Sequence, residues 1–161
     1  MMMLELPEIV GRYARGLFPM EDGWYAAEPR AVFLLDDAAL DTVRSKLARS
    51  LRRAGDFRFH ADGAFSEVIE RCARPRDRSD GVWLTPWIAE QYARAAFLES
   101  MFHTVPHAGN VLLVRTLEHL AAAGFALADI QTPTDHTLRL GAVQLSRDEF
   151  ERRLATALGL S

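Results

Sequence analysis

The sequence has only one cysteine, Cys72, among its 161 residues. A single cysteine excludes a disulfide within the chain and a cysteine-rich zinc site. Long hydrophobic runs are also missing, because no stretch reaches the roughly 20 apolar residues that a membrane-spanning helix needs. The N-terminus lacks the charged segment followed by an apolar segment that is typical of a signal peptide. We therefore expect a cytoplasmic protein that has no membrane partner.

The chain also lacks the glycine-rich patterns G-x-G-x-x-G and G-x-x-x-x-G-K-[ST], whose backbone amides cradle phosphates. His103 and His107 have the four-residue spacing of some metal sites. Pro106 lies between them, so they are not expected to share a helix face, and no third ligand is evident. The sequence therefore predicts neither a bound cofactor nor a metal ion.

Hydrophobic residues make up 49% of the chain, which is enough for a substantial core and excludes wholesale disorder. The net charge of −3 argues against a generic nucleic-acid coat but allows a local basic face. The length fits one domain. We expect a single compact domain over residues 1–161, with residues 1–60 as a small N-terminal subdomain.

Helical and strand-like patterns alternate along the chain, which favours a mixed helix and sheet class. Capping residues and apolar spacing predict helices over residues 4–13, 38–53, 62–72, 86–96, 111–123 and 147–158. Short apolar or alternating stretches predict strands over residues 29–35, 57–60, 97–102 and 125–131. Each strand is followed by a polar loop or a helix start.

Five cations fall within ten residues of the second predicted helix: Arg44, Lys46, Arg49, Arg52 and Arg53. One interpretation is an ordinary solvated helix face. The other is a surface that contacts phosphates, since the rest of the chain is acidic and the positive charge is concentrated here. Such a local basic face suits binding of structured RNA through its backbone.

Three polar residues interrupt apolar stretches. Glu99 lies among Phe97, Leu98 and Met101, where burying an unpaired carboxylate would cost several kcal/mol. Asp129 and Gln131 lie near the end of another predicted strand. Polar groups at strand ends often converge on a cleft, although three unrelated polar residues would give the same pattern. The aromatic side chains shortly before Glu99 are usually core residues, and they would also suit the wall of an apolar pocket: Trp83, Trp87 and Tyr92.

Several stretches, taken in order, resemble the leucyl/phenylalanyl-tRNA–protein transferases. They are "RGLFPM", "WYAAEPRAVF", "GAFSEVIERCA", "DGVWLTP", "ESMF", "ADIQTPTDH" and "LGAVQLSRDEF". The resemblance implies transfer of leucine or phenylalanine from aminoacyl-tRNA to the N-terminal amine of a protein that begins with Arg or Lys, which marks that protein for degradation. It also implies an α+β fold with an N-acyltransferase-like (GNAT-like) sheet flanked by helices.

The resemblance assigns roles to single residues. Glu99 matches a glutamate associated with holding the aminoacyl α-amino group, and Asp129 and Gln131 match a pair associated with peptide-bond formation. The basic helix matches the positive cluster of the family that faces tRNA. The pocket around the aminoacyl group is implied to include Trp83, Tyr92 and Met101, together with Thr116 and Leu120, which stand where phenylalanines are expected.

The chain also departs from the family pattern. After Ala95 the family carries an extra segment long enough for a β-hairpin of the central sheet, whereas this chain runs directly from a helix into the strand with Glu99. Loss of a central hairpin exposes a sheet edge, which a second copy of the chain would cover in a homodimer. Three functions stay open: a compact aminoacyl-tRNA–protein transferase, which retention of the three polar residues favours; a degenerate homologue that binds tRNA or aminoacyl-tRNA without catalysis; and a different acyl transfer.

Overall fold

The structure, a computed structural model, describes residues 6–20, 22–53, 57–59, 67, 70 and 103–157. Contacts within the chain divide it into two compact units. The first unit comprises residues 1–26 and 62–102, and the second comprises residues 27–61 and 103–161. Each unit is described by itself. The expected single domain with residues 1–60 as a subdomain stays a prediction.

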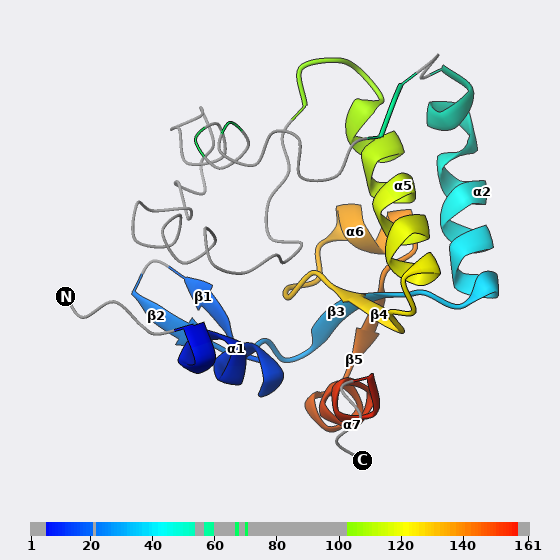
Figure 1. The fold of residues 1–161 in the computed structure, drawn as a ribbon. Helices are drawn as coiled ribbons and strands as arrows, with labels where there is room; N and C mark the ends of the chain where they lie inside the picture. The colour runs from blue at the N-terminus through cyan, green and yellow to red at the C-terminus, as the bar shows by residue number, and fades with distance from the viewer. Residues whose placement is uncertain are drawn as a thin grey trace. The chain divides into compact units, whose positions relative to one another are not determined.

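In the first unit, the described residues between 6 and 25 form a helix followed by a two-stranded hairpin (Figure 1). Helix α1 (Leu6–Ala14) confirms the helix expected over 4–13. It ends before Gly16, whose φ of 71° suits glycine because glycine has no Cβ. Strand β1 (Phe18–Met20) pairs antiparallel with β2 (Gly23–Tyr25). The sequence analysis missed this hairpin because three-residue strands are too short to show alternation.

Trp24 connects the hairpin to α1. The ring centroids of Trp24 and Tyr13 lie 5.3 Å apart in an edge-to-face arrangement, which aromatic pairs favour. The guanidinium carbon of Arg12 lies 5.3 Å from the Trp24 ring centroid, and the same guanidinium donates a hydrogen bond of 2.8 Å to Glu8. These contacts fix β2 against the helix.

The second unit is built on a three-stranded antiparallel sheet with the order β4-β3-β5. Strand β3 (Arg30–Leu34) pairs with β4 (Leu127–Asp129) on one side and with β5 (Val143–Leu145) on the other. The middle of β3 is almost fully buried, as expected for a central strand covered on both faces. The strand expected over 29–35 is thus confirmed. The strand expected over 125–131 forms over a shorter span.

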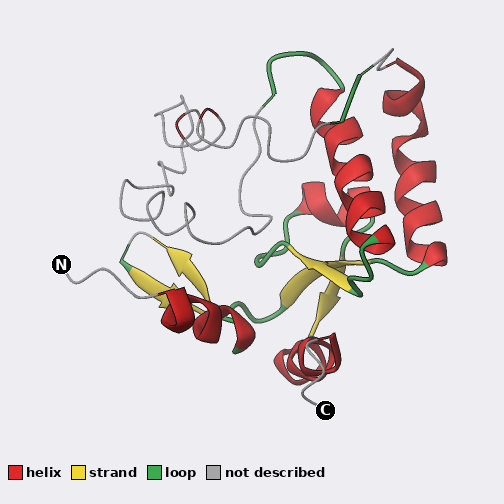
Figure 2. Cartoon of the chain, in the orientation of Figure 1, coloured by secondary structure: helices red, strands yellow, loops and turns green. Residues whose placement is uncertain are grey.

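Helices lie on both sides of this sheet. Figure 1 shows α2 (Asp37–Arg53) and α5 (Ala108–Ala122) next to each other on one side, and α7 (Arg147–Ala157) on the other. The short helix α6 (Asp135–Leu140) connects β4 to β5. Figure 2 shows the same arrangement by type of element. The described residues therefore have the expected mixed helix and sheet class.

Two of the helix caps expected from the sequence, at Asp36 and Ser146, form among the described residues. The Asp36 carboxylate accepts a hydrogen bond of 2.9 Å from the backbone N–H of Ala39 at the start of α2. The Ser146 hydroxyl accepts one of 3.3 Å from the N–H of Glu149 in the first turn of α7. The helices expected over 38–53, 111–123 and 147–158 are all present, although α5 begins three residues earlier than expected.

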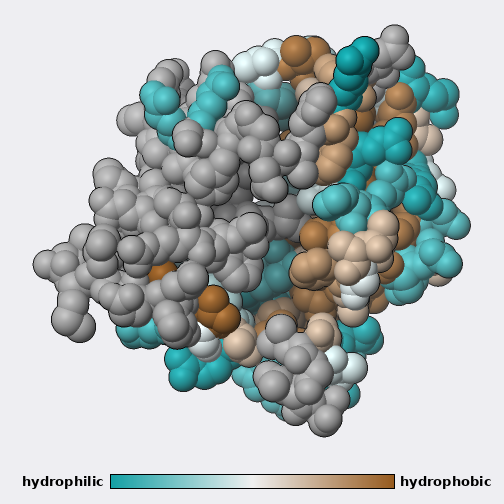
Figure 3. Space-filling model, in the orientation of Figure 1, coloured by the Kyte–Doolittle hydropathy of each residue, from teal (hydrophilic) through white to brown (hydrophobic). Residues whose placement is uncertain are grey.

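The helix pair buries its apolar sides against each other and the sheet. The buried residues recur every three or four positions, as an amphipathic helix requires: Leu40, Val43 and Leu47 in α2, and Val111, Val114 and Leu117 in α5. On the face drawn in Figure 3, hydrophilic residues gather at the right, over α2. The solvated side of α2 is thus opposite its packed side.

The strand expected over 57–60 was wrong for its described part, because Phe57 to Phe59 are not in a strand. Alternation of residues is not sufficient for a strand, which also needs a partner to pair its backbone. The Phe59 ring instead lies 5.7 Å from the imidazole of His119 on α5. His60 lies outside the described residues.

Helix α6 and strand β5 were not expected from the sequence. Thr134 caps α6, because its hydroxyl accepts a hydrogen bond of 3.1 Å from the N–H of Thr137. The helix has only six residues, none of which is buried, so its apolar spacing carries no signal. The elements expected over 62–72, 86–96 and 97–102 lie outside the described residues, apart from the helical positions Glu67 and Glu70. Among the helices described, none is long and apolar enough to cross a membrane.

Two glycines allow a matched test of the packing between α2 and the end of α6. Gly141 has φ 113°, and a Cβ there would lie 2.9 Å from Cγ2 of Val43. Gly124 has φ 86°, and no described atom lies within 4 Å of its Cβ position. We expect Gly124→Ala to lower the free energy of unfolding by about 1 kcal/mol, through backbone strain alone. Gly141→Ala adds a clash and should cost about 2–4 kcal/mol. Urea unfolding measures both, and equal losses would contradict the close packing at Gly141.

Candidate functional site

Asp129 lies at the end of β4 and forms an ion pair with Arg30 of β3. Asp129 is directly opposite Val32, and Arg30 precedes Val32 by two residues, so both side chains project from the same face of the sheet. The Arg30 Nε–H donates a hydrogen bond of 2.8 Å to Oδ1 of Asp129, and Nη2 donates a second bond to Oδ2. This two-bond arrangement is among the stronger and more directional ion pairs in proteins.

The Arg30 side chain is buried, with only 1% of its surface exposed, whereas Asp129 is 25% exposed. The guanidinium carbon of Arg30 lies 4.7 Å from the ring centroid of Phe150, a buried residue of α7. Burying an arginine is costly unless its charge is paired. The carboxylate of Asp129 supplies the opposite charge, and the Phe150 ring supplies a favourable surface for the cation.

Gln131 has a left-handed backbone with φ 60°, an uncommon conformation for a residue with a side chain. Its N–H donates a hydrogen bond of 2.9 Å to Oδ1 of Asp129. Its carbonyl accepts one of 2.9 Å from Ala31, whose own carbonyl accepts one of 3.1 Å from Ile130. Ile130 and Gln131 thus both face Ala31 of β3. This is the arrangement of a β-bulge, which redirects side chains near functional sites.

The Gln131 side chain is partly buried, and its amide hydrogen-bonds no other residue in the part of the chain that the structure describes. An amide can donate and accept at once. A carboxylate offers about four acceptor positions, of which the contacts above use three. Among the described residues, the Gln131 side-chain amide and one acceptor position of Asp129 therefore have no hydrogen-bond partner.

The other residues expected at the site are distributed as follows. Thr116 and Leu120 are partly buried and lie one turn apart on α5. Glu118 on the same helix contacts α2, so at about 100° per residue both side chains point away from α2. The remaining expected residues lie outside the described residues: Glu99, Trp83, Tyr92 and Met101.

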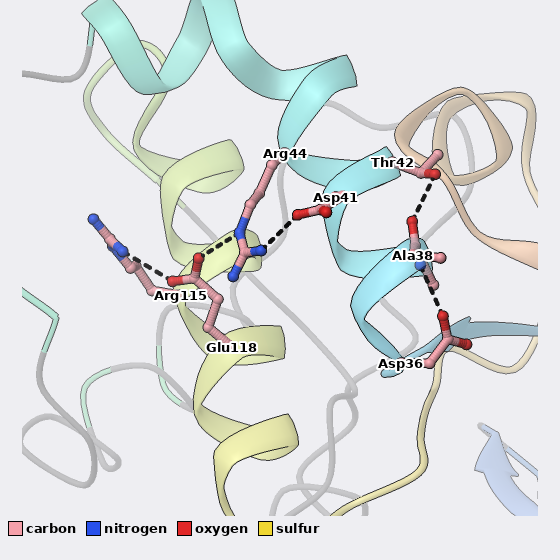
Figure 4. Close-up of polar contacts among 8 residues, drawn as sticks. Asp36, Ala38, Asp41, Thr42, Arg44, Arg115 and Glu118 are labelled. Atoms are coloured by element: carbon pink, nitrogen blue, oxygen red, sulfur yellow. Dashed lines mark hydrogen bonds and ion pairs between the residues drawn. The ribbon is translucent and has the colours of Figure 1, made fainter.

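Arg44, one of the five cations expected to face tRNA, connects α2 to α5 (Figure 4). Its Nε–H donates a hydrogen bond of 2.9 Å to Glu118, and Nη1 donates one of 2.9 Å to Asp41. Arg115 donates another of 2.9 Å to Glu118. Partial burial by itself would raise the pKa of Glu118, but the hydrogen bonds and positive charges of Arg44 and Arg115 outweigh it and lower that pKa. The charge of Arg44 is therefore balanced within the protein.

The other four cations form what we call the basic face of α2: Lys46, Arg49, Arg52 and Arg53. All four are exposed. At about 100° per residue they occupy an arc of about 120°, away from the buried residues of α2. Within the described ranges none of them forms an ion pair with an acidic residue. This face is the part of the expected tRNA-binding cluster whose charge is open to solvent.

Sequence reasoning missed a polar cluster between α2 and α5. Ser50, buried near the end of α2, lies 3.1 Å from Nδ1 of His107 and accepts a hydrogen bond of 2.7 Å from Asn110 of α5. The described residues contain no group of three or more side chains suited to a metal ion. Arg30 was also missed. Its only signal was a charge at the start of the apolar stretch "RAVFLL".

Comparison with known proteins shows consistent similarities. A family model described as leucyl/phenylalanyl-tRNA protein transferase matches residues 35–97 and 92–155. The chain is 39% identical to the leucyl/phenylalanyl-tRNA–protein transferase of Anaeromyxobacter dehalogenans strain 2CP-C, over 96% of this chain and 80% of the relative. It is 33% identical to the protein of that name from Pseudomonas entomophila strain L48, over 93% of this chain and 80% of the relative. The chain is also 34% identical to the protein of that name from Salinibacter ruber, over 95% of this chain and 80% of the relative.

The alignments also show a difference in length. The Anaeromyxobacter alignment spans 190 positions, whereas 96% of a 161-residue chain is about 155 residues. About 35 positions of that alignment therefore have no residue of this chain opposite them. The family model matches in two parts that meet between residues 92 and 97. This break supports the sequence-based expectation that a segment is missing after Ala95.

The bridge from α2 to α5 predicts a pH-dependent stability. The pKa of Glu118 is lowered in the folded state, so its contribution is present above the unfolded value of about 4.3 and is lost as the pH falls through the folded value. We expect Glu118→Gln to lower the Tm most at pH 7, and the difference from the unmodified protein to shrink toward pH 3. Asp41→Asn is the control, because it removes only the pair within α2. Thermal melts whose difference stays constant across this pH range would contradict the bridge.

Proposed function

The chain belongs to the leucyl/phenylalanyl-tRNA protein transferase family, and we propose that it transfers leucine or phenylalanine from aminoacyl-tRNA to the N-terminal amine of a protein. The acceptor begins with Arg or Lys, as the family resemblance implies. The observation that carries this proposal is the identity of 39% over 96% of the chain and 80% of a relative with that name. The retained Asp129 and Gln131, joined in one hydrogen-bonded arrangement, support it.

The proposed chemistry starts from an ester that is already activated. The acceptor amine attacks the carbonyl carbon of the aminoacyl ester, a C–N bond forms, and the C–O bond to the tRNA ribose breaks. The amine loses a proton and the released ribose hydroxyl gains one. The protein therefore mainly has to bring the reactants together and manage these protons.

Each site residue has a place in this proposal. The Gln131 amide orients the amine or the ester carbonyl, and the remaining acceptor position of Asp129 receives the amine proton directly or through water. Glu99 pairs with the α-ammonium of the donor amino acid. The donor side chain is expected to contact Trp83, Tyr92, Met101, Thr116 and Leu120.

For the fold, we propose that the sheet of the second unit belongs to an N-acyltransferase-like (GNAT-like) sheet that lacks a central hairpin. The antiparallel strands with helices on both faces support this assignment. The roughly 35 alignment positions that this chain lacks and the break of the family match at residues 92–97 also support it. A homodimer that covers the edge left by the missing hairpin stays a prediction, because the strand expected over 97–102 lies outside the described residues.

The same difference in length favours a second candidate function, in which the protein binds tRNA or aminoacyl-tRNA without catalysis. A transferase that has lost part of its sheet can keep a surface for RNA after losing its pocket. In both functions the basic face of α2 contacts the tRNA backbone. Arg44 contributes least, because Asp41 and Glu118 already balance its charge.

A transfer assay separates the two functions. Purified protein is incubated with labelled Leu-tRNA or Phe-tRNA and a peptide that begins with Arg, and with a control peptide that begins with Glu. We expect label on the Arg peptide alone. In the folded variant, Asp129→Asn should lower kcat at least about tenfold and leave the Kd for aminoacyl-tRNA within about twofold, because Asp129 acts in the reaction step and in the orientation of Gln131. Binding of tRNA without any labelled peptide would favour the second function.

The basic face predicts a salt-dependent affinity for tRNA. Arg49→Glu with Arg52→Glu should weaken binding and make the slope of log K against log salt less steep by about two, one for each lost phosphate contact. The control is the double variant Arg152→Glu with Arg153→Glu on α7, which changes the net charge by the same amount. Unlike Arg49 and Arg52, these two arginines form ion pairs with Glu149 in this structure. Filter binding over a salt series measures both, and equal effects of the two double variants would exclude a specific role for α2.

A further inference from the structure

We infer that Arg30 is a positioning residue of the proposed transfer site: through Asp129 it holds the backbone of Gln131 in the conformation that presents the Gln131 amide. Its catalytic meaning rests on the proposed function. The structural part, that Arg30 fixes Gln131, rests only on contacts within the second unit.

The first step is that Arg30 itself is fixed. Its guanidinium is buried, is held by two hydrogen bonds to one carboxylate, and lies over the Phe150 ring. A guanidinium is a planar, rigid group of donors, so two bonds to Asp129 determine the plane and rotation of the carboxylate. A lysine at this position would keep the charge but would not impose that orientation.

The second step is that Asp129 passes this constraint to Gln131. One oxygen, Oδ1, accepts hydrogen bonds both from Nε of Arg30 and from the backbone N–H of Gln131. Gln131 has φ 60°, a strained conformation for a residue with a side chain, which persists only when its surroundings impose it. If the carboxylate rotates, Gln131 loses the bond on its N–H and keeps only the one from Ala31 to its carbonyl.

A purely structural role for Arg30 would have a different signature. In that case Arg30 connects β3, β4 and α7, and its loss weakens the whole sheet to the same extent whatever residue occupies position 131. If Arg30 has a positioning role, its loss affects the backbone at Gln131 alone, and its effect on kcat disappears once the Gln131 amide is removed. The two roles therefore differ in which amides respond and in whether the losses of kcat add.

The experiment compares Arg30→Lys, Gln131→Ala and the double variant with the unmodified protein. Arg153→Lys is the matched control, since Arg153 also pairs with a carboxylate but on the exposed side of α7. Amide hydrogen exchange by NMR is the first measurement. We expect Arg30→Lys to speed exchange at Gln131 about tenfold or more, while the amides of Val32 and Leu34 in β3 change less than twofold. Arg153→Lys should change none of them.

Transfer kinetics are the second measurement. Arg30→Lys should lower kcat about tenfold and leave KM for aminoacyl-tRNA within about twofold. Adding Arg30→Lys to Gln131→Ala should lower kcat no further. If Arg30→Lys does not fold, Phe150→Leu gives the same test, because it keeps the guanidinium but removes the ring that covers it.

The outcomes are distinct. Unchanged exchange at Gln131, or equal acceleration at Gln131 and throughout β3, overturns the inference. The inference is also overturned if Arg30→Lys lowers kcat by the same factor in the unmodified protein and in the Gln131→Ala variant. If the unmodified protein transfers no amino acid, the proposed function fails, and the exchange measurement alone decides whether Arg30 positions Gln131.

Discussion

The ion pair of Arg30 with Asp129 is the contact on which the arrangement of the second unit depends most. It joins the central strand to β4, places a cation over the Phe150 ring of α7, and shares an oxygen with the backbone of Gln131. Removing one partner of such a buried pair leaves an uncompensated charge, which typically costs about 3–5 kcal/mol. The same contact therefore serves the stability of the sheet and the geometry of the candidate site.

Helices α2 and α5 contact each other through both apolar and polar side chains. Apolar residues fill the space between them, and polar bridges stand beside this core: Arg44 with Glu118, and Ser50 with His107 and Asn110. These bridges fix how the two helices face each other. A consequence is that the cations of α2 are not equivalent, because Arg44 bridges the two helices while the basic face is exposed to solvent.

The sequence predicted the helices better than the strands, and it singled out two residues, Asp129 and Gln131, that the structure joins by a hydrogen bond. Asp36 and Ser146 mark helix starts by local capping, and the spacing of apolar residues extends over several turns, so α2 and α7 could be located. Strands of three residues carry no comparable pattern, and the alternation at Phe57 to Phe59 was misleading because this stretch pairs with no strand among the described residues. Asp129 and Gln131 were found from their place at a strand end. Arg30 was not, because its contact spans 99 residues of sequence.

The alignment with the Anaeromyxobacter dehalogenans relative leaves about 35 positions without a residue of this chain. The two parts of the family match meet at residues 92–97, in the segment assigned to the first unit. All the groups that fix Gln131 belong to the second unit, namely Arg30, Ala31, Asp129 and Phe150. None of the contacts among them needs a residue from the missing segment. The hydrogen-bonded arrangement of carboxylate and amide is therefore compatible with the shorter chain.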